Sequence, residues 1–338
     1  MGEPSYIDWR FAATTGKKLH RGGPRLSAAE ASDAVAELRD AACRAHDPVA
    51  QTAQLVTPDD IGAVRVVDRS AWVDVNIASL DGMIAPVVDK ITAKVSGGEV
   101  GGLMAFMSSK VLGQYDIAPG GTPSLLLVAP NIVQVERELD VDPHDFRLWV
   151  CLHEEAHRVQ FTAVPWLREH VVSAARDLLV DMAPTPEEMA TRVGEIAKRV
   201  PEAFKEGSMG LSDIFATPEQ RTRMADLAAV MSLLEGHADV VMDDVGPQIV
   251  PSVETIRARF GDRRAGLGNI DKQLRRLMGL EAKMRQYRDG AAFVRGVQEK
   301  VGIDGFNAVW AAPENLPTPA EIQRPQLWVE RIHGSLFR

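Results

Sequence analysis

Cysteine is scarce in this sequence of 338 residues, and basic residues are outnumbered by acidic ones. Only Cys43 and Cys151 are present, which is too few for a disulfide framework. Lysine and arginine total 38 against 47 acidic residues, which gives a net charge of −9. This balance does not favour a basic surface for nucleic acid or for an anionic membrane, so we expect neutral, basic or small partners.

Long hydrophobic runs are also missing. No stretch of eighteen apolar residues occurs, and residues 1–6 have neither the basic opening nor the apolar centre of a signal peptide. We therefore expect a cytoplasmic protein with no membrane partner and no nucleic-acid partner. What is present is ordinary globular material, with 45% hydrophobic and 25% charged residues, enough to bury a substantial core.

The strongest pattern is an HExxH motif at residues 153–157, inside an apolar segment that predicts a buried helix. Random order of the same residues would give roughly 0.01 such motifs. Residues four apart share a helix face, so His153 and His157 can ligate one tetrahedral zinc ion, with Glu154 beside them as general base. Cys151 faces away from such a metal, and we interpret it as a small core residue. A structural alternative has both histidines hydrogen-bonded to neighbours, with Glu154 and Glu155 on a solvated face.

A catalytic zinc usually has three protein ligands, so a third is expected elsewhere in the chain. Glu235 lies in a largely apolar helical stretch, 228–242, where a carboxylate is expected to be paired or metal-bound. Asp239, four residues later on the same face, can orient a ligating histidine. His237 is the rival ligand, but on a helix it points about 200° away from Glu235, so the two are not expected to bind the same ion. If Glu235 is the ligand, His237 is either a donor to substrate or a packed histidine. Glu235 and Asp239 could also be ordinary surface acids.

The HExxH segment followed about eighty residues later by Glu235-Gly236-His237-Ala238-Asp239 resembles the pattern of glutamate zincins. More closely, the chain resembles actinobacterial zincin-like hydrolases, some of which are associated with biosynthesis of a deazaflavin coenzyme. The supporting stretches are residues 113–116, 153–157 and 235–239, and the resemblance covers roughly residues 50–330. It implies a zincin-like fold and metal binding, with the second glutamate as a zinc ligand, and it brings no substrate.

Most of the chain has the periodicity of helices. Ser27 and Glu30 form a capping box that starts one helix, and Thr217 is expected to start the helix that carries Glu235 and ends at Gly246-Pro247. Further helices are predicted at residues 71–80, 84–95, 171–180, 187–200 and 253–260. Residues 113–116 predict a polar turn, and the glycines of 97–102 indicate close helix packing or a break between helices. Residues 124–131 are the clearest strand, either an edge strand that binds a peptide substrate or a core strand.

We therefore expect a mainly α (α+β) fold, zincin-like, with a small β element before the HExxH helix. Residues 1–26, with four glycine or proline residues near one another, predict a flexible N-terminal arm. Residues 27–338 are expected to form a single metallohydrolase domain, with a helical N-terminal part at 27–122 and a metal-binding part at 123–338. Arginines between 257 and 295 predict solvated helix faces, with an anion-binding site as the alternative.

The function predicted is a zinc-dependent hydrolase, specifically a metallopeptidase with one zinc per chain, held by His153, His157 and Glu235. Glu154 is the expected general base, and Tyr115 and His237 are candidate substrate or oxyanion donors. The substrate is expected to be a peptide or a small-molecule amide, and the sequence gives no oligomeric state. The alternative function is a catalytically idle zinc-binding scaffold that recognises a partner in coenzyme metabolism.

Overall fold

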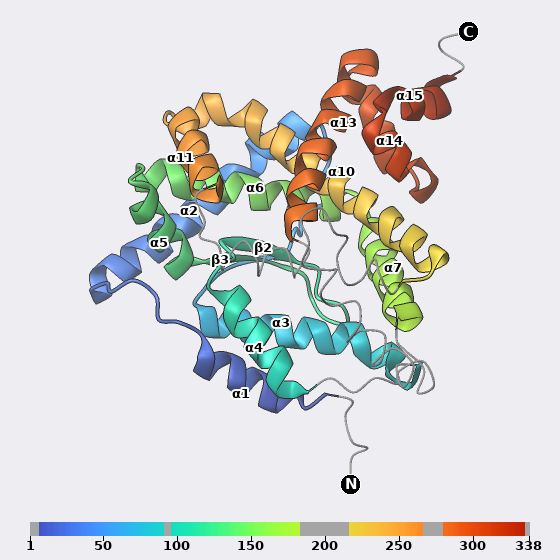
Figure 1. Cartoon of the computed structure of the whole chain (residues 1–338). Coiled ribbons are helices and arrows are strands. Elements are labelled where there is room, and N and C mark those ends of the chain that lie inside the picture. The colour runs from blue at the N-terminus through green and yellow to red at the C-terminus, as the bar shows by residue number, and fades with distance from the viewer. Residues whose placement is uncertain (1–6, 91–95, 183–215, 266–279, 335–338) are drawn as a thin grey trace. The chain divides into compact units, whose positions relative to one another are not determined.

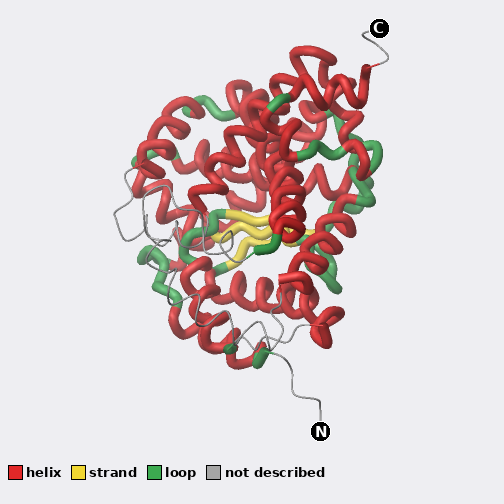
Figure 2. The backbone as a smooth tube through the Cα atoms, turned by 45° about the vertical axis from the view of Figure 1, so that its right-hand side comes forward, coloured by secondary structure: helices red, strands yellow, loops and turns green. Residues whose placement is uncertain are grey.

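The computed structural model describes residues 7–90, 96–182, 216–265 and 280–334. Helices predominate in these ranges, with one small sheet, which confirms the mainly α (α+β) class (Figures 1 and 2). Contacts within the chain define two compact units. The first comprises Met1–Ala85, Lys94–Arg168 and His237–Ala265, and the second comprises Pro86–Ala93, Glu169–Gly236 and Gly266–Arg338. The predicted division into an N-terminal arm at residues 1–26 and a single domain at residues 27–338 stays a prediction.

The sheet of the first unit has three short strands, β1 (Ala63–Val67), β2 (Gly113–Asp116) and β3 (Ser124–Val128). Their order is β1-β3-β2, with β1 parallel and β2 antiparallel to β3. Leu125 lies opposite Val64 on one side and Tyr115 on the other. The turn predicted at residues 113–116 is wrong, because these residues form a strand. Of the two alternatives for residues 124–131, the structure favours the core strand, since β3 is central and all its residues are buried.

Alternate residues of β3 enter two different cores, as the two-residue period of a strand requires. Leu125 and Leu127 pack with α2 (Ala28–Ala53) and α6 (Pro143–Ala163). Leu126 and Val128 pack with α1 (Trp9–Leu19), α3 (Arg69–Ile84) and α4 (Gly97–Ser108). The sheet thus separates the helix that carries HExxH from the layer of α1, α3 and α4 (Figure 1).

Helix α1 lies within residues 1–26, the range of the predicted N-terminal arm. The Asp8 side chain caps the helix by accepting from the Phe11 amide, at 2.8 Å. Helix α4 packs against α1 through glycines, because a Cβ atom at Gly101 would stand 2.6 Å from the Ala12 carbonyl oxygen. The glycines of 97–102 therefore belong to a helix capped by Ser96, and Gly97 and Gly101 serve close packing.

Helix α2 begins with the predicted capping box of Ser27 and Glu30. Helix α5 (Ala129–Leu139) follows β3 directly, with Pro130 in its first turn. Helix α11 (Val253–Ala265) begins at the predicted residue.

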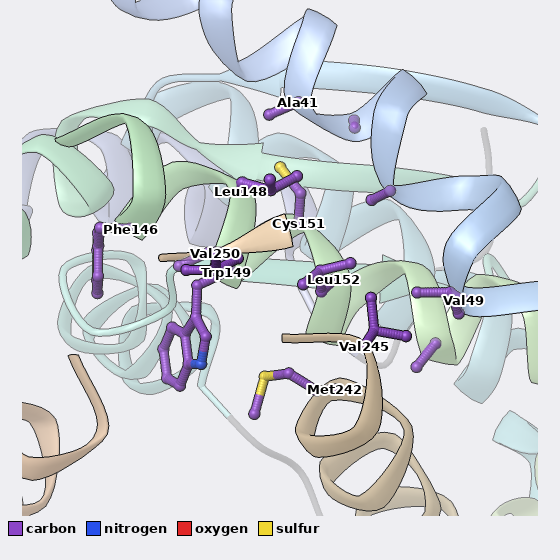
Figure 3. Close-up of a cluster of buried hydrophobic side chains, with 14 of the residues drawn as sticks. Ala41, Val49, Phe146, Leu148, Trp149, Cys151, Leu152, Met242, Val245 and Val250 are labelled. Atoms are coloured by element: carbon purple, nitrogen blue, oxygen red, sulfur yellow. The ribbon is translucent and has the colours of Figure 1, made fainter. Parts of the chain in front are cut away.

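The larger core of the first unit is built around α6 (Figure 3). Phe146, Leu148 and Leu152 of α6 are among its fully buried or nearly fully buried side chains. Met242 and Val245 pack there from α10 (Pro218–Ile249). Cys151 is fully buried, with its thiol 3.9 Å from the Leu38 carbonyl oxygen, and burial raises its pKa, which confirms it as a core residue.

The second unit contains α7 (Leu167–Met182), the first part of α10, and the C-terminal helices α13 (Leu280–Asn307), α14 (Pro319–Gln323) and α15 (Pro325–His333). Short 3₁₀ helices complete it at Ala85–Lys90, Ala308–Trp310 and Pro313–Asn315. Helix α10 continues past Gly246-Pro247 to Ile249, so its predicted end is early. The helix predicted at 84–95 is 3₁₀ up to Lys90, and the remainder, like 187–200, lies outside the described residues.

One stretch of the described chain, Arg69–Val88, is long and apolar enough to cross a membrane by length and composition, with a mean hydropathy of 1.3. Such a stretch is weak evidence alone. Its polar side chains have partners in the first unit: Arg69 donates to the Asn131 side chain, Asp74 pairs with Lys17, and Ser79 donates to Asp116. These contacts connect α3 to α5, α1 and β2, and the absence of a membrane partner stays a prediction.

Candidate metal centre

Helix α6 holds the HExxH motif at its centre and is fixed at its start. Asp142 caps it by accepting from the Asp145 amide, and Pro143 occupies the first turn. The Asp145 carboxylate in turn accepts from the backbone and hydroxyl of Ser252, at 2.8 and 2.6 Å. This end of the helix is thereby held to the segment that follows α10.

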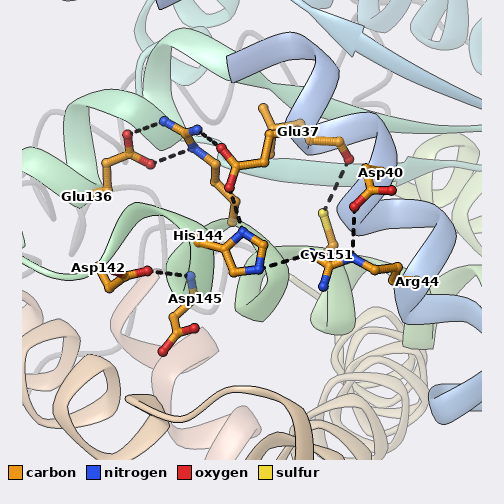
Figure 4. Close-up of polar contacts among 10 residues, drawn as sticks. Glu37, Asp40, Arg44, Glu136, Asp142, His144, Asp145 and Cys151 are labelled. Atoms are coloured by element: carbon orange, nitrogen blue, oxygen red, sulfur yellow. Dashed lines mark hydrogen bonds and ion pairs between the residues drawn. The ribbon is translucent and has the colours of Figure 1, made fainter. Parts of the chain in front are cut away.

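A second polar cluster ties α6 to α2 and α5 (Figure 4). Arg147 binds the carboxylate of Glu136 on α5, at 2.6 and 3.0 Å, and also that of Glu37 on α2. His144 contacts Glu37 at 2.8 Å. Burial raises the pKa of Glu136 despite the arginine beside it. The motif is therefore carried on a helix whose position is set by charged contacts as well as by the core.

The two motif histidines lie one turn apart, with ring centroids 4.9 Å apart and ring planes perpendicular. Donor atoms of His153, His157 and Glu235 all lie within 4.8 Å of one another. Ligands of a tetrahedral zinc ion stand about 3.4 Å apart, so small side-chain rotations would close this set on a metal. Two imidazoles and one carboxylate are a ligand set of catalytic zinc sites, and the residues present therefore fit zinc.

Glu235 reaches this set from α10, whose continuous helix includes the boundary between the two units at Gly236 and His237. His237 and Asp239 follow it by two and four residues, within about one helical turn, so the helix itself sets the spacing of the three side chains. Glu235 and not His237 belongs to the three-residue set among the described residues. The sequence-based preference for Glu235 agrees with this geometry.

Each motif histidine has an outer contact at Nδ1. Asp239 Oδ1 stands 3.7 Å from His153 Nδ1, an ion-pair distance that is too long for a hydrogen bond. Gln160 Oε1 stands 3.1 Å from His157 Nδ1, within hydrogen-bonding distance. Nδ1 of both rings is thus directed toward outer partners, which leaves Nε2 of both rings for a metal.

Gln160 is the site residue that the sequence reasoning missed. It is fully buried, and its Nε2 stands 3.0 Å from Nδ1 of His237, so one amide joins His157 to His237. Burial, with a smaller effect of the nearby His157, lowers the pKa of His237 to about 3, so His237 is neutral near pH 7. A glutamine three residues after the second motif histidine, on the same helix, is the signal that could have identified it.

Glu154 lies against the edge strand β2. Its side chain is 8% exposed, and a Cβ atom built at Gly113 would stand 2.4 Å from Glu154 Cγ. Only glycine leaves room for the carboxylate arm at this point. The strand order makes β2 an edge of the sheet among the described strands, so the predicted general base is beside an edge strand.

Glu155 points to the other side of α6 and is fully buried. Its carboxylate pairs with Arg158 at 2.7 Å and with His46 of α2 at 2.7 Å. A buried carboxylate needs such partners, because desolvation otherwise disfavours its charged form. The alternative in which Glu154 and Glu155 form a solvated face is therefore wrong, and Glu155 fixes the HExxH helix to α2.

The other two candidates differ in their surroundings. Tyr115 of β2 stacks on Phe161, one helical turn after His157, with ring centroids 5.7 Å apart. Burial raises the pKa of its phenol, so the hydroxyl keeps its proton and can donate at neutral pH. His237 is 2% exposed, which favours the packed histidine over a donor to substrate.

Arginines of α11 pair with acidic residues rather than forming an anion site. Arg257 contacts Asp243, Arg259 contacts Asp140, and Arg263 donates to Glu138 at 3.0 Å. Solvated, paired helix faces are therefore the better interpretation for these three. The side chains of the arginines at 264, 275, 276, 285 and 288 lie outside the described residues.

A search of curated proteins finds no match. Among solved structures, a proposed hydrolase with a novel fold from Chloroflexus aurantiacus is similar, at 29% sequence identity and a TM-score of 0.69, and the match covers 97% of this chain and 99% of that one. The family model described as zincin-like metallopeptidase matches residues 7–329. This chain therefore belongs to the family of zincin-like metallopeptidases.

Proposed function

We propose that this protein is a zinc-dependent hydrolase of amide bonds and, more specifically, a peptidase. The observation that carries the proposal is that donor atoms of His153, His157 and Glu235 all lie within 4.8 Å of one another. Glu154 directly follows His153 in the chain. Family membership supports zinc binding, and the similar structure of a proposed hydrolase supports hydrolysis. One zinc ion per chain would use His153 and His157 through Nε2 and Glu235 through a carboxylate oxygen.

Glu154 has the role of general base. Zinc bound at this centre would supply Lewis-acid polarisation of the scissile carbonyl and a water of lowered pKa. Glu154 accepts the proton of the attacking water on a carboxylate oxygen and then delivers it to the leaving nitrogen. Its contact with Gly113 limits where the carboxylate can move between these two transfers. Asp239 has the role of orienting His153, because it stands next to the outer ring nitrogen.

The edge strand β2 is the element that we assign to a peptide substrate, in place of β3. An extended peptide can add to an exposed strand edge through main-chain hydrogen bonds. Tyr115 on this strand then supplies a protonated hydroxyl as an oxyanion donor. A small-molecule amide, such as one in a coenzyme side chain, is the alternative substrate, and the resemblance to proteins linked with deazaflavin biosynthesis is what favours it. A cytoplasmic location without membrane or nucleic-acid partners is part of the same proposal.

An idle zinc-binding scaffold is the weaker alternative, because a metal-binding structure alone has no use for a buried carboxylate at Glu154. The variant Glu154→Gln separates the two. It keeps the shape of the side chain and removes the proton acceptor. The variant is therefore expected to retain zinc, while its turnover number falls by about 10²- to 10⁴-fold.

The assay compares a mixture of unstructured peptides with small acyl amides, using protein with measured zinc content. Glu138→Gln, which alters an exposed carboxylate on α5, is the matched control and is expected to hydrolyse substrate like the parent protein. Hydrolysis of both substrate classes at the parental rate by Glu154→Gln would rule out the assigned base. Zinc binding without hydrolysis of either class by the parent would favour the scaffold.

A further inference from the structure

The amide of Gln160 stands between two histidines from different helices. His157 precedes it by three residues on α6, and His237 lies on α10. Gln160 Oε1 is 3.1 Å from His157 Nδ1, and Gln160 Nε2 is 3.0 Å from His237 Nδ1. Gln160 is fully buried and His237 is 2% exposed. Water cannot readily replace these hydrogen bonds, so breaking them would cost free energy.

The oxygen of an amide only accepts hydrogen bonds and its NH₂ group only donates them. The amide therefore distinguishes the two tautomers of each neutral histidine ring. When its oxygen faces His157, the proton of that ring is on Nδ1 and the lone pair is on Nε2. Its NH₂ group then donates to His237 Nδ1, so the proton of that ring is on Nε2. The reversed amide would require the opposite proton position in both rings.

We propose that Gln160 is a positioning residue that holds His157 in the tautomer needed for metal ligation, and that His237 acts on the metal site through this amide without being a ligand. Ligation by His157 Nε2 requires a proton on Nδ1, which the Gln160 oxygen accepts. His237 Nδ1 in turn accepts from the other end of the amide and opposes its reversal. The inference rests on the proposed zinc site, because the required tautomer is defined by ligation.

Two substitutions at Gln160 separate its accepting end from its donating end. Gln160→Met keeps the length of the side chain and removes both ends, so zinc affinity is expected to fall by about 10- to 100-fold. Gln160→Glu keeps an acceptor for His157 and removes the donor to His237. It is expected to bind zinc within about threefold of the parent, with His237 now protonated on Nδ1. A side chain that served packing alone would give no such division, since methionine fills the space at least as well as glutamate.

Zinc affinity is measured by competition with a chromophoric chelator, and the proton positions by nitrogen NMR of protein with labelled histidine rings. The chain has eight histidines, and the variants His157→Gln and His237→Asn identify the signals of these two rings among them. Gln51→Met, on the exposed face of α2, is the control for a glutamine-to-methionine change. Expected spectra of the parent show His157 protonated on Nδ1 and His237 on Nε2, in zinc-loaded and in metal-free protein.

The inference is overturned if Gln160→Met binds zinc as tightly as the parent, or if its two rings keep the parental proton positions. Equal losses of affinity in Gln160→Met and Gln160→Glu overturn it as well, because the acceptor would then be irrelevant. If the parent binds no zinc, the proposed function fails, and the spectra of metal-free protein still decide whether Gln160 sets the two tautomers.

Discussion

Gly113 of β2 lies directly against Glu154 of α6, so closely that a Cβ atom at Gly113 would stand 2.4 Å from Glu154 Cγ and 2.9 Å from Glu154 Oε1. The edge strand and the proposed general base are therefore in contact at a point where only glycine fits. An exposed carboxylate could move aside, but Glu154 is 8% exposed and is confined by its surroundings. The backbone of β2 thus sets the position of the group that is proposed to move protons.

Gly113→Ala is expected to displace the Glu154 carboxylate and to leave the zinc ligands in place. Turnover should fall at least about tenfold, because a general base must stay within hydrogen-bonding reach of the water, while zinc content should be unchanged. Gly102→Ala is the control, since nothing lies within 4 Å of its added methyl group and alanine is the better helix former. Full turnover by Gly113→Ala would show that the contact does not position the base.

Arg158 neutralises the fully buried Glu155 on the side of α6 that faces α2. Arg158→Met leaves that carboxylate with His46 alone, so the free energy of unfolding should fall by about 3 kcal/mol or more. Urea denaturation of metal-free protein measures the loss. Arg44→Met removes an exposed partner of Asp40 on α2 and should cost about 0 to 1 kcal/mol. Similar losses in the two variants would contradict the account of a buried charge cluster.

His237 makes stability depend on pH in a definite direction. Its pKa is lowered to about 3 by burial, with an ordinary value of 6.5 in the unfolded chain. Between these values the unfolded chain binds a proton that the folded protein excludes, so the free energy of unfolding falls as pH is lowered from about 6.5. One such group changes it by about 1.4 kcal/mol per pH unit.

The measurement is urea denaturation of chelator-treated protein between pH 7 and pH 5, where most carboxylates are still ionised. His237→Asn replaces the ring with a side chain that does not titrate and still offers an acceptor to Gln160. It should show a shallower dependence on pH than the parent. Parallel curves for the two proteins would mean that His237 takes up its proton normally in the folded state.

The elements that the sequence predicted well depend on local rules. The capping box of Ser27 and Glu30 satisfies backbone groups within four residues, and it is present where it was expected. His153 and His157 share a face because of the helix repeat alone. Glu235 was identified because a carboxylate in an apolar helix requires a partner, and the structure brings it to the two histidines.

The elements that it missed depend on contacts between distant segments. Strand β2 has a turn-like sequence and exists because its backbone pairs with β3. The sequence left the glycines of 97–102 open between close packing and a break, and only the contact with α1 decides it: a Cβ atom at Gly101 would stand 2.6 Å from the Ala12 carbonyl oxygen. The spacing of Gln160 from His157 is a local signal, but its contact with His237 exists only because α10 lies beside its amide. Tertiary contacts of this kind override local propensity and leave no periodic signal.

The most direct test of the zinc centre is the metal content of protein purified without added metal, measured by elemental mass spectrometry. The parent and two alanine variants on the same helix are compared, Glu235→Ala at the proposed ligand and Glu219→Ala at an exposed position in the first turn. The account predicts about one zinc ion per chain in the parent and in Glu219→Ala, and a large loss in Glu235→Ala. No zinc in the parent, with none taken up on addition, or full zinc content in Glu235→Ala would contradict it.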